Sequence, residues 1–308
     1  MQLTGDHHPD LRGGRLAGAV AAVAALLLAA GCTSAAGVHG DPSPASSTPA
    51  GQTYVSFTSY PGWIQDTIPP ARFNFSPWTV ISDFGLWPTK SGTIAVGDMG
   101  SLANIPPAVA AAHRAGKTMI MAVGEQGLGP NFAAGANARN RPRLIRSIIT
   151  YVSRYKFDGV DIDWEEEVPQ NEANYVALIK GVRAALNAAF PSRHMYLSAD
   201  VNVGQIPPNI AVRVAPYVDS INLETFQDNG ISSVAAYTQA GIPASKLLLG
   251  IGVAGGYYDT TVARVAAKVK YVETHRLKGT LLWQPGNLRS QRTDPRLAPL
   301  RQMVSIGR

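Results

Sequence analysis

The chain has 308 residues, of which 45% are hydrophobic and 16% are charged. This is the composition of an ordinary globular protein, and the length suits one large domain or two small ones. The formal net charge is +6 at pH 7, and the basic residues are scattered along the chain rather than gathered in a stripe with aromatic residues. This pattern argues against nucleic-acid binding and favours weak attraction to anionic surfaces such as a cell wall.

The first 32 residues have the pattern of an export signal. Two arginines, Arg12 and Arg15, precede an uncharged apolar run over residues 16–30, which is too short for a membrane span. The run ends at Gly31-Cys32 and resembles the lipobox of bacterial lipoproteins, although Ala29 stands where leucine is usual. Cys32 is the only cysteine, so no disulfide can form within the chain.

We therefore expect residues 1–32 to be a lipoprotein signal peptide, with Cys32 as the site of lipidation. The mature protein would be anchored to the outer face of the bacterial cell membrane, and the alternative is a soluble secreted protein cleaved nearby. Residues 33–52 are rich in Ser, Pro, Ala and Gly, and we expect a disordered linker there. The folded domain is expected over residues 53–308.

The rest of the chain alternates short apolar runs with amphipathic stretches. Two of these stretches, Arg141–Tyr155 and Glu172–Ala189, carry apolar residues three and four positions apart, as helices do. Eight apolar runs are typical of strands, and they lie at residues 54–60, 79–85, 118–124, 157–165, 195–201, 220–226, 246–253 and 279–284. Eight such units predict an α/β fold, a single (β/α)8 TIM barrel. An open doubly wound sheet is the alternative, but no glycine-rich phosphate loop follows the first run.

Acidic residues alternate along the fourth run, DGVDIDWE at residues 158–165. Side chains alternate along a strand, so Asp161, Asp163 and Glu165 share one face, with about 7 Å between successive members. Three neighbouring carboxyls inside a barrel must share protons, and this raises some of their pKa values. A glutamic acid with a raised pKa is the acid catalyst that glycosidic cleavage requires. Two alternatives are a divalent-cation site, for which no histidine partner is visible, and a purely structural role.

The octet resembles the D-G-x-D-x-D-x-E signature of glycoside hydrolase family 18, the chitinase family. Three later segments resemble the sixth, seventh and eighth strands of that family, and they lie at residues 220–223, 246–251 and 279–283. The resemblance implies that Glu165 protonates the glycosidic oxygen and that Asp163 orients the substrate's acetamido group. It also implies that Asp161 adjusts the protonation of Asp163, that Asp158 supports the strand end, and that Trp283 stacks on the sugar, with burial in the barrel as the alternative for this tryptophan.

The sequence departs from the family pattern at two strands. The sixth strand of the family reads M-x-Y-D, and its tyrosine hydroxyl holds the acetamido carbonyl, whereas this chain has Glu224-Thr225-Phe226-Gln227. Alternation places Asn222, Glu224 and Phe226 on the interior face. On the third strand, S-x-G-G becomes Ala122-Val123-Gly124-Glu125. The predicted substrate-binding set is Asp158, Asp200, Asn222, Glu224, Phe226, Trp283 and Gln284.

The sequence thus predicts a hydrolase of β-1,4-linked N-acetylglucosamine-containing glycans that uses substrate-assisted retaining catalysis, with no metal and no cofactor. One alternative is a carbohydrate-binding surface barrel that does not cut glycans. The other is a glycosidase that uses Glu165 and Glu224 on a sugar without an acetamido group. The expected partners are the glycan and, through the lipid on Cys32, the membrane; nucleic acid is not expected, and the sequence does not indicate an oligomeric state.

Overall fold

The computed structural model describes residues 53–97 and 100–306. The predicted signal peptide, Cys32 and the linker therefore lie outside the described residues. Within the described part of the chain, every helix is too short or too polar to span a bilayer.

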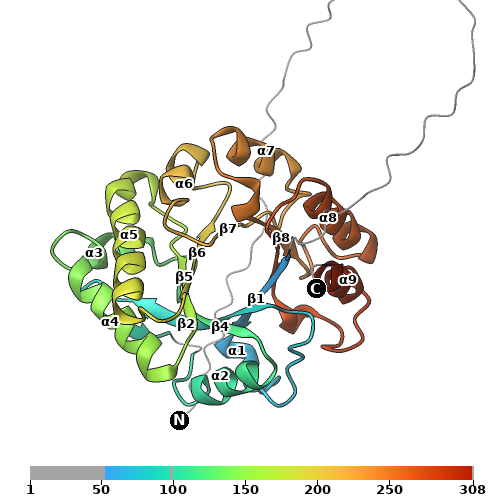
Figure 1. Ribbon diagram of the computed structural model, residues 1–308, viewed down its shortest axis with the longest axis horizontal. Helices are drawn as coiled ribbons and strands as arrows, with labels where there is room; N and C mark the ends of the chain where they lie inside the picture. The colour runs from blue at the N-terminus through green and yellow to red at the C-terminus, as the bar shows by residue number, and fades with distance from the viewer. Residues whose placement is uncertain (1–52, 98–99, 307–308) are drawn as a thin grey trace, which may run out of the picture. The chain divides into compact units, whose positions relative to one another are not determined.

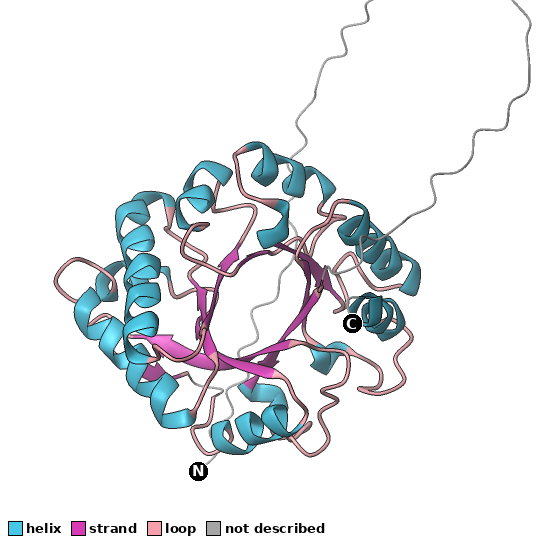
Figure 2. Ribbon diagram, viewed as in Figure 1, coloured by secondary structure: helices cyan, strands magenta, loops and turns pink. Residues whose placement is uncertain are grey.

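Eight parallel strands close into a barrel, and helices surround it (Figures 1 and 2). The strands of the barrel are β1 (Val55–Pro61), β2 (Val80–Pro88), β4 (Thr118–Gly124), β5 (Gly159–Asp163), β6 (Tyr196–Val201), β7 (Ser220–Leu223), β8 (Leu247–Gly252) and β9 (Gly279–Trp283). Pairing between β1 and β2 closes the ring. Each of the eight apolar runs forms one of these strands, so the predicted TIM barrel is confirmed.

The helices lie on the outside of the ring (Figure 2). They are α1 (Gly62–Gln65), α2 (Ile105–Arg114), α3 (Gly129–Gly135), α4 (Arg141–Tyr155), α5 (Glu172–Ala189), α6 (Pro208–Val214), α7 (Ile231–Gln239), α8 (Val262–Thr274) and α9 (Leu297–Ile306). The two predicted helices, α4 and α5, begin and end at the predicted residues. One strand was not predicted: β3 (Ile94–Val96) pairs antiparallel with the end of β2 after a register shift.

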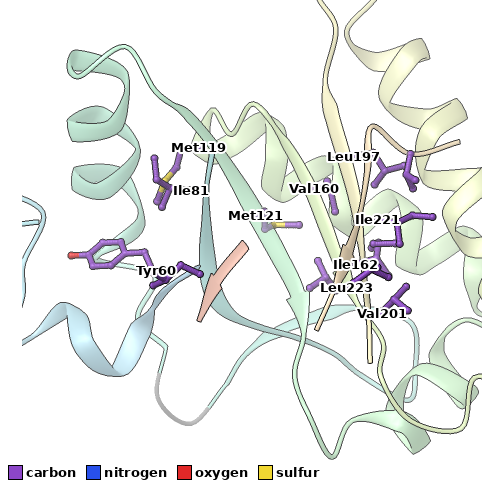
Figure 3. Close-up of a cluster of buried hydrophobic side chains, with 14 of the residues drawn as sticks. Tyr60, Ile81, Met119, Met121, Val160, Ile162, Leu197, Val201, Ile221 and Leu223 are labelled. Atoms are coloured by element: carbon purple, nitrogen blue, oxygen red, sulfur yellow. The ribbon is translucent and has the colours of Figure 1, made fainter. Parts of the chain in front are cut away.

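The main core lies between the strands and the helices. Figure 3 shows part of it, where side chains such as Met121, Ile162 and Leu223 point away from the barrel axis. Trp164 is fully buried in the same layer, with its ring stacked on Phe132 at 4.9 Å between centroids. Ile162 and Trp164 alternate along the chain with Asp161, Asp163 and Glu165, so this layer faces the helices and the acidic residues face the barrel interior.

The barrel interior has an apolar half and a polar half. The apolar half is a cluster of buried side chains contributed by five strands, namely Phe57, Val80, Ile120, Leu248 and Leu281. One step further toward the carboxyl ends of the strands, the interior positions become polar and carry Ser82, Asp161, Ser198 and Asn222, all buried. The apolar layer closes the barrel at its amino end, so the polar groups open only toward the carboxyl ends of the strands.

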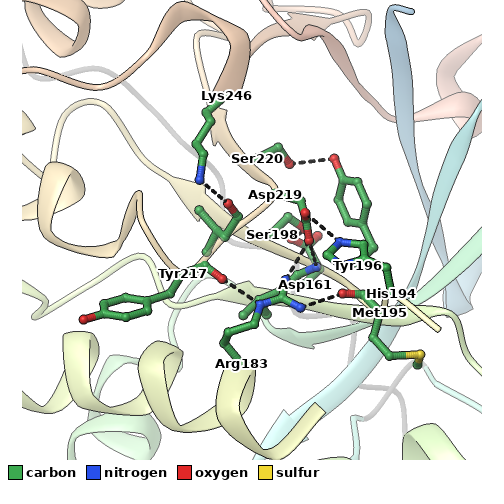
Figure 4. Close-up of polar contacts among 12 residues, drawn as sticks. Asp161, Arg183, His194, Met195, Tyr196, Ser198, Tyr217, Asp219, Ser220 and Lys246 are labelled. Atoms are coloured by element: carbon green, nitrogen blue, oxygen red, sulfur yellow. Dashed lines mark hydrogen bonds and ion pairs between the residues drawn. The ribbon is translucent and has the colours of Figure 1, made fainter. Parts of the chain in front are cut away.

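The amino ends of the strands are fastened by charged residues outside the barrel (Figure 4). Asp219, just before β7, accepts hydrogen bonds from the backbone N–H of Leu197 at 2.9 Å and from the guanidinium of Arg183. His194 Nε2 lies 2.8 Å from the second oxygen of Asp219. Lys246 donates to two backbone carbonyls at the start of the same region. These contacts fix the strands relative to one another and serve stability, because active sites in this fold lie at the carboxyl ends of the strands.

Candidate active site

Asp161 is the most deeply held carboxyl of the polar interior. The hydroxyl of Ser82 donates to its Oδ2 at 3.1 Å, and the hydroxyl of Ser198 and the amide of Asn222 donate to its Oδ1. Burial raises the pKa of Asp161 to about 6, and the two hydroxyl donors limit the rise. Asp161 therefore has its oxygens fully engaged by neighbours and is positioned to affect the next carboxyl along the strand.

Asp163 lies one step nearer the open end, beside carboxyls from two other strands. One oxygen each of Asp163, Asp200 and Glu224 lies within 4.8 Å of the others. Asp200 is held by the amide of Asn222 at 2.6 Å, whereas Oδ1 of Asp163 is buried with no hydrogen-bond partner among the described residues. Burial, together with the neighbouring carboxyls, raises the pKa of all three well above the ordinary range, which favours their protonated forms.

Gly124 allows the close approach of β4 and β5 at Asp163. Its φ is +135°, and a Cβ at this position would lie 1.9 Å from the carbonyl oxygen of Asp163. Only glycine adopts this backbone conformation easily and leaves room for the neighbouring strand. A glycine is therefore required here for the backbone of Asp163 to keep its place.

Glu165 follows two residues after the end of β5 and faces the opening of the barrel. Its Oε2 accepts a hydrogen bond from the amide of Asn202 at 3.0 Å, and its carboxyl is also hydrogen-bonded to Glu224. Burial raises the pKa of Glu165, and the hydrogen bond from Asn202 opposes that rise. A mostly buried carboxyl that shares a hydrogen bond with a second carboxyl is suited to give and take a proton.

Aromatic rings line the opening next to these carboxyls. Trp283, at the end of β9, is half-buried, and its ring centroid lies 5.3 Å from Phe84 and 6.0 Å from Trp63. On the other side, Phe226 packs against Tyr257 at 5.8 Å. Flat apolar rings around a set of carboxyls are suited to the faces of sugar rings, because the C–H groups of a sugar pack against aromatic surfaces.

Comparison with known proteins now places the chain in a family. Residues 54–264 match the model of glycosyl hydrolases family 18. The chain belongs to this family. The alternating acids of residues 158–165 thus belong to the family 18 signature, and the resemblance based on that octet is confirmed.

Individual relatives are similar at a modest level. A chitinase-like effector of Moniliophthora perniciosa is 26% identical over 244 residues, which cover 66% of this chain and 55% of the relative. Chitinase A1 of Niallia circulans is 28% identical over 169 residues, 40% of this chain and 24% of the relative. The chain therefore spans about half or less of the length of these two relatives.

Solved family structures share the fold. The class V chitinase of Nicotiana tobaccum superposes with a TM-score of 0.71 at 16% identity, covering 83% of this chain and all of the neighbour. A chitinase-like agglutinin of Robinia pseudoacacia superposes with a TM-score of 0.70 at 16% identity, covering 81% and 99%. At this identity the likeness shows the barrel fold alone.

Two residues of the predicted set lie away from the cluster of site carboxyls. Asp158 precedes β5 at the amino end of the barrel, where it lies 2.8 Å from His113 Nε2 and accepts the backbone N–H of Met119 at 2.8 Å. This position agrees with support of the strand end and removes Asp158 from the substrate-binding set. Gln284 follows Trp283 directly after the end of β9, but its Oε1 accepts the backbone N–H of Gly286 at 2.8 Å and so serves its own loop.

The remaining predicted residues come together at the open end of the barrel. They are Asp161, Asp163, Glu165, Asp200, Asn222, Glu224, Phe226 and Trp283. The sequence reasoning missed four further residues of this region, namely Trp63, Phe84, Asn202 and Tyr257. A signal for two of them was available. Asn202 comes two positions after Asp200, just past the end of β6, and Phe84 comes two positions after Ser82 on β2, so strand alternation predicts one face for each pair.

The cluster of three carboxyls, Asp163, Asp200 and Glu224, can hold either protons or a cation. Carboxylate oxygens are the ligands that Mg²⁺ and Ca²⁺ prefer, and Asp163, Asp200 and Glu224 could each offer one. No Lys or Arg forms an ion pair with these three residues in the described part of the chain. Burial and mutual repulsion raise the pKa values of the three carboxyls, which favours their protonated forms when no cation is bound.

Proposed function

We propose that the protein is a glycoside hydrolase that cleaves β-1,4-linked N-acetylglucosamine-containing glycans, with Glu165 as the general acid and base. The observation that carries this proposal is the position of Glu165. It is a buried carboxyl with a raised pKa, one alternate position beyond Asp163 and at the open end of the barrel. The aromatic rings around Trp283 supply a surface for the sugar. Solved relatives include a family 18 chitinase from Cycas revoluta in complex with (GlcNAc)3.

The proposed reaction uses the substrate as its own nucleophile. Glu165 gives its proton to the glycosidic oxygen, while the carbonyl oxygen of the 2-acetamido group attacks the anomeric carbon, and the bond to the leaving sugar breaks. Asp163 accepts the N–H of the acetamido group and so holds it in line. Water, deprotonated by Glu165, then opens the oxazolinium ring and restores the starting protonation with retention of configuration.

Asp161, Asp200 and Glu224 act in this scheme through Asp163 and Glu165. Asp161 and Asp200 are both bonded to the amide of Asn222, so charge on either disfavours charge on Asp163. Glu224 shares a hydrogen bond with Glu165 and is the group that keeps a proton close to the catalytic acid. These three carboxyls thereby set which protonation state Asp163 and Glu165 have before cleavage.

A second candidate function follows from Phe226 and Glu224. Phe226 has no hydroxyl to hold an acetamido carbonyl, and the carboxyl of Glu224 contacts Glu165 instead. Two carboxyls that share a proton can serve as acid and nucleophile on a sugar that has no acetamido group. This candidate predicts that Glu224 is as necessary for turnover as Glu165.

A third candidate is glycan binding without cleavage. Relatives whose names describe them as a chitinase-like effector and a chitinase-like agglutinin accompany the chitinases among the similar proteins. The altered sixth strand, with Phe226 in place of a tyrosine, is the observation in this chain that favours it.

One experiment separates the three candidates. The full chain, Glu165→Gln and Glu224→Gln are assayed with fluorogenic chitotrioside and with the matching cellotrioside, which lacks the acetamido groups. The acetamido mechanism is supported if the fluorophore is released from chitotrioside alone and this release falls about 100-fold or more in Glu165→Gln. Release from cellotrioside that requires both glutamates supports the second candidate. Binding of chitotriose by calorimetry without release from either substrate supports the third.

We also propose that the protein is exported and anchored through a lipid on Cys32. The support is the apolar run at residues 16–30 followed by the only cysteine of the chain. Expression in a bacterium with labelled palmitate tests this, because the label should appear in the wild type and be absent from Cys32→Ser. Labelling of neither protein would contradict the anchor.

A further inference from the structure

The segment between β4 and β5 is strongly basic. Between Glu125 and Asp158 the sequence has six basic residues and no aspartate or glutamate. Three of the six, Arg139, Arg143 and Arg146, are exposed and lie at or near the start of α4. Like charges three and four residues apart repel one another on a helix surface, so their accumulation costs stability unless something anionic binds there.

A lysine from the hairpin between β2 and β3 adds to this surface. The side-chain amide of Asn140, next to Arg139, donates to the carbonyl of Lys90 at 3.1 Å, which fixes the hairpin against the start of α4. Lys90 is exposed like the three arginines. We call Lys90, Arg139, Arg143 and Arg146 the basic rim. Across the described ranges 53–97 and 100–306, no acidic side chain forms a salt bridge with any of the four.

The basic rim lies on the same side of the barrel as Glu165. α4 follows β4 and precedes the parallel strand β5, so its first turn is at the carboxyl ends of the strands. The loop that leads to it begins at Glu125, which accepts the indole N–H of Trp87 at 2.8 Å. Further along, the backbone N–H of Gly127 donates to Glu166, the neighbour of Glu165, at 2.7 Å.

Buried carboxyls do not neutralise this surface. Asp163, Asp200 and Glu165 are buried inside the barrel, whereas the four cations of the basic rim are exposed. The positive end of the α4 dipole adds to the field at the rim.

We propose that the basic rim binds anionic substituents, carboxylate or phosphate, on a glycan chain bound at the open end of the barrel. Exposed cations of this kind attract an anionic polymer at long range and form hydrogen-bonded ion pairs at contact. The natural glycan is then an acidic polysaccharide, and the neutral part of it enters the barrel. This inference rests on the proposed function only in taking the open end of the barrel as the place of the glycan.

Binding of matched polymers tests the rim apart from cleavage. The full chain carrying Glu165→Gln is titrated with carboxymethyl-chitin, with phosphorylated chitin and with neutral glycol chitin at low ionic strength. The two anionic polymers should bind roughly tenfold or more tightly than glycol chitin, and the advantage should shrink as salt is added. Comparison of the two anionic polymers tells whether carboxylate or phosphate is preferred.

Substitutions place the effect on the rim. Each of Lys90→Gln, Arg139→Gln and Arg143→Gln should weaken binding of the anionic polymers about two- to fivefold and leave glycol chitin unchanged. Arg154→Gln is the matched control, because it removes an exposed arginine from the other end of α4, about 16 Å along the helix. The control should bind like the parent.

Two results would overturn the inference. One is equal affinity for charged and neutral polymers, and the other is a loss in Arg154→Gln as large as in the rim variants. Rim-dependent binding of the anionic polymers without any binding of glycol chitin would support the rim and count against the proposed function. The two proposals can therefore fail separately.

Discussion

Aspartates at the two ends of the barrel have opposite surroundings. At the amino end, Asp158 and Asp219 each accept a backbone N–H from the start of a neighbouring strand, and each lies beside an arginine and a histidine. At the carboxyl end, Asp163 and Asp200 lie among other carboxyls, and no cation pairs with them among the described residues. The same side chain is thus fully satisfied at one end and strongly perturbed at the other.

This difference shows how the fold separates stability from chemistry. Ion pairs and backbone hydrogen bonds at the amino end hold neighbouring strands together and so contribute to stability. Burial and mutual repulsion at the carboxyl end favour the protonated acid, which costs stability but supplies proton donors. Substitutions at the two ends should therefore have opposite effects on activity and on unfolding.

The largest expected effect is the loss of activity in Asp163→Asn. The neutral amide cannot accept the acetamido N–H in the same way, so kcat/KM on a fluorogenic chitotrioside should fall about 100- to 1000-fold. The free energy of unfolding at pH 7 should stay the same or rise by up to about 2 kcal/mol, because an unpartnered buried carboxyl is removed. Urea unfolding of both proteins measures the second part. A less stable variant that keeps its activity would contradict the contrast between the two ends.

Much of the barrel could be predicted because its signals are local. Apolar runs mark the eight strands, and spacings of three and four mark α4 and α5, whose ends match the predicted residues. β3 was missed because its pairing depends on how far β2 continues beyond Gly85, which only the folded barrel decides.

The site was predictable along a strand and poorly predictable across strands. Alternation correctly placed Asp161, Asp163 and Glu165 together, but the octet also includes Asp158, which lies at the other end of the strand. Seven steps of about 3.3 Å separate Asp158 from Glu165, so neighbours in a motif need not share a site. Trp63, just after β1, contacts Trp283, at the end of β9, because these two strands are neighbours in the barrel, and no local sequence pattern predicts this contact.

The pH dependence of stability gives the next largest effect. Asp83, on the outer side of β2, is buried, accepts one hydrogen bond from Gln65 at 3.0 Å, and has its pKa raised by burial to about 7. The folded state then binds this proton more tightly than the unfolded chain, where the pKa is 3.8. The stabilisation is complete below pH 4 and is lost as the pH rises through 7.

Asp83→Asn should remove this loss. Between pH 4 and pH 7, wild-type protein should lose about 1–4 kcal/mol more unfolding free energy than Asp83→Asn, where the upper value is the full pKa shift. Asp161 and the other site carboxyls with raised pKa values add losses that the two proteins share. Urea unfolding at several pH values measures the slope, and exposed Asp66→Asn is the control. Equal slopes in Asp83→Asn and wild type would show that Asp83 is ionised in the folded protein.

Asp219→Asn should have a moderate effect of the opposite kind. The substitution leaves Arg183, whose side chain is 14% exposed, without its anionic partner and weakens the acceptor for the Leu197 N–H. Unfolding free energy should fall by about 1–3 kcal/mol, while kcat on chitotrioside stays within about twofold, since Asp219 is at the far end of the barrel. A large loss of activity in folded Asp219→Asn would mean that the two ends are coupled.

The smallest expected effect separates the two partners of Asp219. His194 is 68% exposed, so solvent screens its pair with Asp219, and His194→Gln should change the unfolding free energy by less than about 1 kcal/mol. Arg183→Gln should cost more, because this guanidinium is mostly buried and also donates to the backbone carbonyls of Tyr217 and Met195. A double-mutant cycle of each partner with Asp219→Asn measures the two couplings. A coupling to His194 equal to that of Arg183 would mean that surface charge, rather than the buried guanidinium, fastens the amino ends of β6 and β7.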